Sequence, residues 1–113
     1  MAATFSRLLG VRYPFDRFSQ LVVGDFVTGG MENTTMVINN ISTLHEPSEK
    51  PLADSTGLVA HELAHQWFGD FVTCADWSHL WINEGFASFL PAFWTRETEG
   101  RSEERRVGKE CRL

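Results

Sequence analysis

Two short runs of β-branched and other apolar residues stand out in the first half of the chain. Residues 20–26 (QLVVGDF) and 35–41 (TMVINNI) flank the pair Gly29-Gly30. Runs of this kind on either side of glycines predict two strands joined by a glycine loop. The polar stretch 43–51, which contains two prolines, predicts a surface loop after the second strand.

The apolar spacing changes to that of a helix after this loop. Asp54 or Ser55 can cap a helix that runs to about Phe68, and Gly69 suits the position just after its end. Apolar residues recur along one arc of this helix, namely Val59, Ala60, Leu63, Ala64 and Trp67. The arc predicts a packed face, which leaves the opposite, polar face free for chemistry.

A second helix is predicted to begin near residues 81–84. Its apolar residues recur at the i, i+3, i+4 and i+7 spacing of one buried side, at Phe86, Phe89, Leu90 and Phe93. Pro91 lies inside this pattern and removes the hydrogen bond to the Ala87 carbonyl, so we expect it to kink or break the helix. The start of the helix lies upstream of the proline and should be unaffected.

Length and composition bound the fold. A chain of 113 residues with 42% hydrophobic content and four tryptophans predicts one small globular domain. No run approaches the roughly eighteen apolar residues of a membrane span, and the N-terminal residues lack the hydrophobic stretch of a secretion signal. We therefore expect no membrane span and favour a cytoplasmic location. The two cysteines, Cys74 and Cys111, make no disulfide framework and predict free thiols.

The last thirteen residues differ from the rest of the chain in charge. Residues 1–100 hold five basic and twelve acidic residues, whereas residues 101–113 hold five basic and three acidic ones. A solvated terminus would have this composition, yet residues 101–112 resemble the in-frame translation of a common sequencing adapter. We interpret residues 101–113 as a non-native tail, which makes Cys111 a non-natural residue and places the natural continuation beyond Gly100.

The strongest chemical signal is the sequence HELAH at residues 61–65, followed after an eighteen-residue gap by Glu84. At about 100° per residue, His61 and His65 lie about 40° apart on a helix, so both imidazoles can reach one ion. Glu62 borders the same face, where it can hold a water without ligating the metal. Three ligands, His61, His65 and Glu84, leave the fourth position of a tetrahedral zinc open, which is the catalytic arrangement. Manganese or cobalt could occupy the same set.

A second motif, Gly29-Gly30-Met31-Glu32-Asn33, precedes the histidines. Together the two motifs resemble the M1 aminopeptidases (the membrane alanyl aminopeptidase and leukotriene A4 hydrolase group), whose signatures are G-[AG]-M-E-N followed by H-E-x-x-H-x18-E. The blocks YPFDRF, GDFVT and LWINEGFA also resemble this family. The resemblance extends from about residue 9 to residue 93.

This resemblance implies both a fold and an activity. Residues 1–100 would be part of a thermolysin-like α+β catalytic domain, with short β-strands followed by two zinc-ligand helices. One zinc ion per chain would be held by the two histidines and Glu84, with Glu62 as the general base. Glu32 would bind the free α-amino group of a peptide, and the rest of the glycine motif would line the bound substrate. The expected partners are peptides with a free N-terminus, with no nucleic acid.

One family feature is missing from the chain. Family members stabilise the oxyanion with a tyrosine downstream of the last zinc ligand, and the only tyrosine here is Tyr13, upstream of both motifs. Removing one oxyanion donor commonly costs about 10²–10³ in rate. The chain is therefore interpreted as a truncated piece of a zinc aminopeptidase. The alternatives are a leukotriene A4 hydrolase-like bifunctional epoxide hydrolase and an inactive zinc- or peptide-binding fragment.

Several further polar residues are expected to lie outside this site. His45 and His79 lack the spacing of metal ligands. Cys74 is predicted to be a small buried apolar side chain. Asp70 or Asp76 could orient a ligand histidine through a hydrogen bond, and the sequence does not choose between them.

Overall fold

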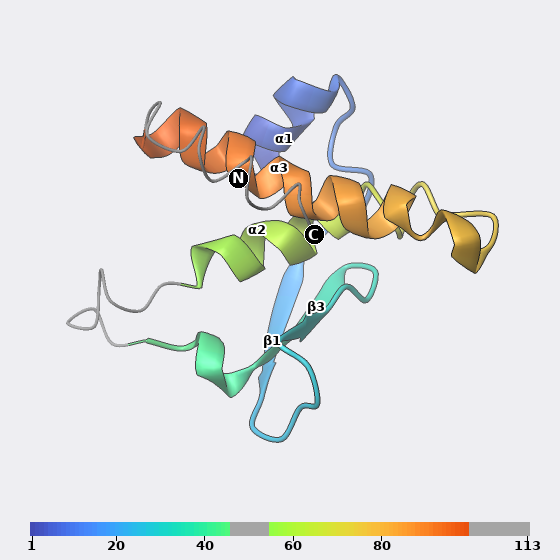
Figure 1. The fold of residues 1–113 in the computed structure, drawn as a ribbon. Helices are drawn as coiled ribbons and strands as arrows, with labels where there is room; N and C mark the ends of the chain where they lie inside the picture. Colours follow the sequence, from blue (N-terminus) through green and yellow to red (C-terminus); the bar gives the residue numbers. More distant parts are fainter. Residues whose placement is uncertain (46–54, 100–113) are drawn as a thin grey trace.

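The computed structural model describes residues 1–45 and 55–99, which form a small α+β fold (Figure 1). Its elements are α1 (Ala2–Leu9), β1 (Ser19–Val23), β2 (Gly30–Met31), β3 (Met36–Asn40), η1 (Ile41–Thr43), α2 (Thr56–His65), η3 (Trp77–His79) and α3 (Trp81–Glu99). The interpreted tail and most of the loop predicted at 43–51 lie outside the described residues. Among the helices of the described ranges, none combines the length and apolar character needed to cross a bilayer.

Strand β3 is the centre of a three-stranded sheet with the order β1-β3-β2. Both predicted strands form, but β1 and β3 pair in parallel, with Ser19 opposite Met36. A parallel pair requires a crossover of about a dozen residues, and residues 24–35 provide it. The glycine loop therefore does not close a simple hairpin. Within it, Gly30–Met31 forms β2, which pairs antiparallel with β3 and places Gly30 opposite Asn39.

Helix α2 begins and ends close to the predicted positions. Ser55 occupies the N-cap position, but its hydroxyl donates to the Thr43 carbonyl at 2.7 Å instead of capping the helix. The regular helix ends at His65, and tighter turns continue the coil as far as Phe68. Gly69 follows with a φ of 127°, a conformation that favours glycine, and it turns the chain away from the helix axis.

The hydrophobic core lies between α2 and α3. Four of the five apolar residues predicted on the packed arc of α2 are buried, whereas Val59 is half-buried. They pack with Phe5 of α1 and with Ala87 and Leu90 of α3. The ring of Trp67 meets that of Phe5 edge to face, with 6.0 Å between the ring centroids. This packing fixes α2 from one side, and Figure 1 shows the sheet on its other side.

Helix α3 runs through Pro91 without interruption, so the predicted break is wrong. The proline is buried, and the turns on both sides of it are held by tertiary packing, which outweighs the loss of one backbone hydrogen bond. An ion pair between Arg7 and Glu97, with 2.7 Å between nitrogen and oxygen, also links the C-terminal part of α3 to α1. The predicted buried side is partly correct, because Leu90 is buried while Phe86 is 39% exposed.

Candidate metal and peptide site

The three predicted metal ligands converge between α2 and α3. The Nε2 atoms of His61 and His65 lie 3.0 Å apart, and the Glu84 carboxylate lies 3.5 Å from the first and 3.4 Å from the second. Zinc–ligand bonds of about 2.0–2.1 Å at tetrahedral angles place ligand atoms about 3.3–3.4 Å apart. The three distances therefore fit a single tetrahedral zinc ion, and the donor set of two imidazoles and one carboxylate suits that metal.

The ring of His65 is oriented by the chain immediately after it. This side chain is almost completely buried, and its Nδ1 lies 3.0 Å from the Phe68 carbonyl, to which it donates. Because Nδ1 carries the proton, Nε2 keeps its lone pair for the point where the three ligands meet. Backbone carbonyls commonly orient ligand histidines in this way.

The ring of His61 lies next to the Ala87 backbone of α3, one turn before Pro91. Proline has no N–H, so the Ala87 carbonyl lacks the donor that a helix normally supplies four residues later. The Ala87 backbone acts on the His61 ring as a hydrogen-bond acceptor that raises its pKa, and we infer that Nδ1 is the donor, because Nε2 faces His65. Burial and the neighbouring His65 lower the pKa of His61 despite this bond, which favours the neutral, metal-binding ring.

The predicted general base, Glu62, is packed against the glycine motif. Its side chain is 4% exposed, and its Oε2 has no hydrogen-bond partner among the described residues. A methyl group at Gly30 would lie 2.6 Å from Glu62 Oε1, which is closer than real contacts allow. Glycine at this position therefore lets β2 approach α2. Burial, reinforced by nearby carboxylates, raises the pKa of Glu62 to about 7, although His65 opposes the rise.

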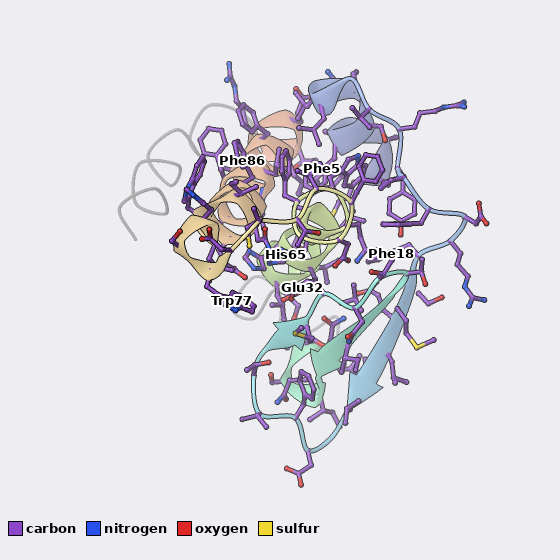
Figure 2. All side chains as sticks on the ribbon, turned by 90° about the vertical axis from the view of Figure 1, so that its right-hand side faces the viewer. Phe5, Phe18, Glu32, His65, Trp77 and Phe86 are labelled. Atoms are coloured by element: carbon purple, nitrogen blue, oxygen red, sulfur yellow. The ribbon has the colours of Figure 1, made fainter. Side chains whose placement is uncertain are left out.

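The predicted amine anchor, Glu32, follows β2 and reaches the same site. Its Oε1 lies 4.0 Å from Nδ1 of His65, and Figure 2 shows the two side chains facing each other between the helices and the sheet. Glu32, Glu62 and His65 form a second group of close ligand atoms. We do not assign a metal to that group, because its histidine nitrogen already donates to the Phe68 carbonyl.

The other glycine-motif residues lie farther from the metal ligands. Gly29 faces Leu58, and its carbonyl accepts from the Asn40 N–H at 2.9 Å. The side chain of Met31 is 44% exposed. The carbonyl of Asn33 closes a tight turn by accepting from the Met36 N–H at 3.1 Å. The structure thus brings Gly30 against Glu62 and Glu32 close to His65, while the remaining residues of the motif shape the loop.

The polar residues expected outside the site do lie outside it. His45 contacts Ser55 Oγ at 2.7 Å, and His79 is exposed in η3. Neither suggested aspartate orients a ligand histidine: Asp76 accepts from the Ser78 N–H, and Asp70 accepts from the side-chain amide of Gln66, just after α2. Cys74 is a free thiol but is only half-buried.

Sequence reasoning missed three contributors to the site. The carbonyls of Phe68 and Ala87 are backbone groups, which the identity of a residue does not reveal; Pro91 was the available signal for the second. The third is Gln66, a fully buried amide next to His65. No sequence signal identified it, because its burial depends on contacts with residues distant in sequence.

The raised pKa of Glu62 predicts that the stability of the metal-free chain depends on pH. The group titrates near 4.5 when unfolded and at about 7 when folded. Its contribution is therefore present below pH 4.5 and is lost as pH rises through about 7. The pKa of Asp70 shifts in the same direction and that of His61 in the opposite direction. We expect Glu62→Gln to reduce the change in the free energy of unfolding with pH, measured by denaturant unfolding across this pH range. The same pH dependence in both proteins would contradict the raised pKa of Glu62.

The bond between His61 and Ala87 predicts an effect of Pro91→Ala on zinc affinity. The new N–H at position 91 competes with His61 for the Ala87 carbonyl. Losing a partner of a ligand histidine typically costs 10- to 100-fold in affinity, and partial competition should cost about tenfold. Competition with a chromophoric chelator measures this change. Thr95→Ala serves as the control, since the Thr95 hydroxyl donates to the Pro91 carbonyl and leaves Ala87 untouched. Unchanged affinity in Pro91→Ala would show that His61 does not need this acceptor.

The chain resembles known proteins in both sequence and fold. Residues 1–112 match the Peptidase family M1 domain. The chain is 42% identical over 90 residues to aminopeptidase N of Canis lupus familiaris, which covers 76% of the chain and 9% of that protein. It is 39% identical over 90 residues to aminopeptidase M1 of Arabidopsis thaliana, covering 76% of the chain and 10% of that protein. The chain thus spans about a tenth of the length of these relatives.

A solved structure shows the same arrangement of elements. The crystal structure of an M1 zinc metallopeptidase mutant from Deinococcus radiodurans superposes with a TM-score of 0.74 and 26% identity. The match covers 94% of this chain and 22% of that one. Because the family match spans nearly the whole sequence and the fold agrees, the chain belongs to peptidase family M1.

Proposed function

We propose that this chain is part of a zinc-dependent aminopeptidase that hydrolyses the N-terminal peptide bond of peptides. The observation that carries the proposal is the meeting of His61, His65 and Glu84 at tetrahedral spacing, with two further carboxylates beside them. The names of the relatives, which are aminopeptidases, support the substrate class. Because the chain spans about a tenth of their length, the proposal concerns the full-length protein.

The chain's own residues would divide the chemistry between them. When bound to the two histidines and Glu84, zinc would polarise the scissile carbonyl and make a water molecule more acidic. Glu62 would accept the proton of the attacking water and deliver it to the leaving amine. Its carboxylate lies beside His65, and its unpartnered Oε2 is free to take the proton.

Glu32 would restrict cleavage to the first peptide bond. Its carboxylate lies within 4.0 Å of a ligand histidine ring, so an ammonium bound there sits about one residue from the metal. A protonated α-amino group would form a charge-assisted hydrogen bond with this carboxylate. An internal peptide segment has no such charge and would leave the carboxylate partly desolvated and unpaired.

Tyr13 does not take the role of an oxyanion donor in this arrangement. Its hydroxyl lies 2.8 Å from the Arg17 carbonyl and 3.2 Å from Gln66 Oε1. We therefore assign the oxyanion donor to a part of the full-length protein outside this chain. No observation on the described residues favours epoxide hydrolysis, so that alternative is not proposed.

The role of Glu32 predicts a selective loss of exopeptidase activity in Glu32→Gln. In the full-length protein we expect kcat/KM for free-amine peptides to fall about 10- to 100-fold, the value of one hydrogen bond to a charged group. N-acetylated peptides should be poor substrates of both proteins. Glu97→Gln is the matched control, because it removes the same charge at an exposed position remote from the site. Equal cleavage of free and acetylated peptides by the unmodified protein would refute the anchor.

The role of Glu62 predicts that Glu62→Gln separates zinc binding from turnover. We expect one zinc ion per chain in both proteins and a fall in kcat of about 10²- to 10⁴-fold, the usual contribution of a general base. Metal analysis and initial-rate kinetics measure the two quantities. If the unmodified full-length protein binds zinc without turnover, the binding-only alternative holds. Wild-type turnover in Glu62→Gln would exclude Glu62 as the base.

A further inference from the structure

Gln66 connects the zinc-ligand helix to three other segments of the chain. The residue follows His65 directly and is completely buried. Its Oε1 accepts from the Thr35 N–H at 2.9 Å and faces the Tyr13 hydroxyl at 3.2 Å. Its Nε2 donates to Asp70 Oδ2 at 2.9 Å and faces the Asn33 carbonyl at 3.4 Å. One side chain thus holds a turn, an N-terminal segment and the loop after α2.

The neighbours fix which way the amide of Gln66 points. The Thr35 N–H can only donate, so it must face the amide oxygen. The Asn33 carbonyl can only accept, so it must face the amide nitrogen, next to the Asp70 carboxylate. Both ends of the amide therefore have matching partners, and its burial leaves no polar atom unpaired. Removing the amide would leave its hydrogen-bond partners on several segments of the chain unpaired.

The turn that Gln66 holds is strained at Thr35. This residue has a φ of 65°, the left-handed conformation that a β-branched side chain rarely adopts. Such a conformation is strained and persists only where the surroundings impose it. Here the N–H of Thr35 is held by Gln66, and its carbonyl accepts from the Ser19 N–H at 2.8 Å, at the start of the β1–β3 ladder.

The held turn adjoins the amine anchor in sequence. Asn33 follows Glu32 in the sequence, and Gln66 follows His65. The contact between Gln66 Nε2 and the Asn33 carbonyl therefore links the chain next to Glu32 with the chain next to His65, and these two side chains face each other. Resting on the proposed function, we propose that Gln66 is a positioning residue that sets the distance between Glu32 and the metal ligands. It thereby sets where the amino group of a peptide lies relative to the bond that is cut.

Hydrogen exchange in the chain itself tests the structural half of this proposal without any turnover. Gln66→Leu keeps a similar side-chain volume but removes the acceptor of the Thr35 N–H, so this amide should exchange at least about tenfold faster. Tyr13→Phe is the matched control. It removes the hydroxyl that faces the same oxygen and leaves the bonds to Thr35 and Asn33 in place, so exchange should stay unchanged. Unchanged Thr35 exchange in Gln66→Leu would overturn the proposal.

Kinetics in the full-length protein test the functional half. Gln66→Leu should raise KM for free-amine peptides about tenfold, with a smaller change in kcat. The ratio of kcat/KM for free-amine peptides to kcat/KM for acetylated peptides should fall by a similar factor. In a Glu32→Gln background the same substitution should not lower this ratio any further. A fall in kcat with intact KM and intact selectivity would show a merely structural role and overturn the proposal. If the unmodified protein has no turnover, the proposed function fails while the exchange result still stands.

A second variant covers the case in which Gln66→Leu does not fold. Gln66→Glu retains an acceptor oxygen for the Thr35 N–H and replaces only the donor end of the side chain. The measurement is made at a pH well below the raised Asp70 pKa of about 6, so that the two acids can share a proton. We expect Thr35 exchange close to that of the unmodified chain under this condition. Exchange as fast as in an unfolded peptide, in a variant that is otherwise folded, would contradict the role of the acceptor.

Discussion

The close packing of α2 against α3 is the constraint on which the ligand geometry depends. Ala60 and Ala64 of α2 and Ala87 of α3 are fully buried and belong to one core cluster. Side chains at the contact set the distance between packed helices, and methyl groups permit a short one. At this distance Glu84, in the first turn of α3, can face both histidines of α2. Larger side chains on this seam would separate the carboxylate from the rings while leaving both helices intact.

The glycine motif and α2 together place two carboxylates, Glu32 and Glu62, close to each other beside His65. Burial comes first in raising the pKa of Glu62 and Asp70, and Glu32 raises both further. Without cations these carboxylates repel each other, so each one opposes the ionisation of its neighbours. A divalent ion on one side and a substrate ammonium on the other would offset this repulsion. Metal binding would thus be coupled to the stability of the chain as well as to the proposed chemistry.

Local sequence patterns predicted the individual helices and strands better than the contacts between them. The spacing of His61 and His65 follows from helix geometry, whereas Glu84 was predicted from its eighteen-residue gap after the histidines, as in the motif that the sequence resembles. The parallel pairing of β1 and β3 could not, since it depends on contacts between residues distant in sequence. Helix α1 was not predicted, although Phe5 and Leu9 have helical spacing. The continuity of α3 through Pro91 depends on packing that no local rule contains.

The contact between Gly30 and Glu62 links two motifs that lie about thirty residues apart in the sequence. Because the backbone of one strand and the carboxylate of one helix occupy adjoining space, the volume at position 30 limits where the Glu62 carboxylate can lie. The motif that the sequence resembles allows alanine as well as glycine at this position. A chain with alanine there would hold the Glu62 carboxylate slightly farther from the strand than this chain does. Residue 30 can therefore adjust the position of a carboxylate on α2 without any change in the helix that carries it.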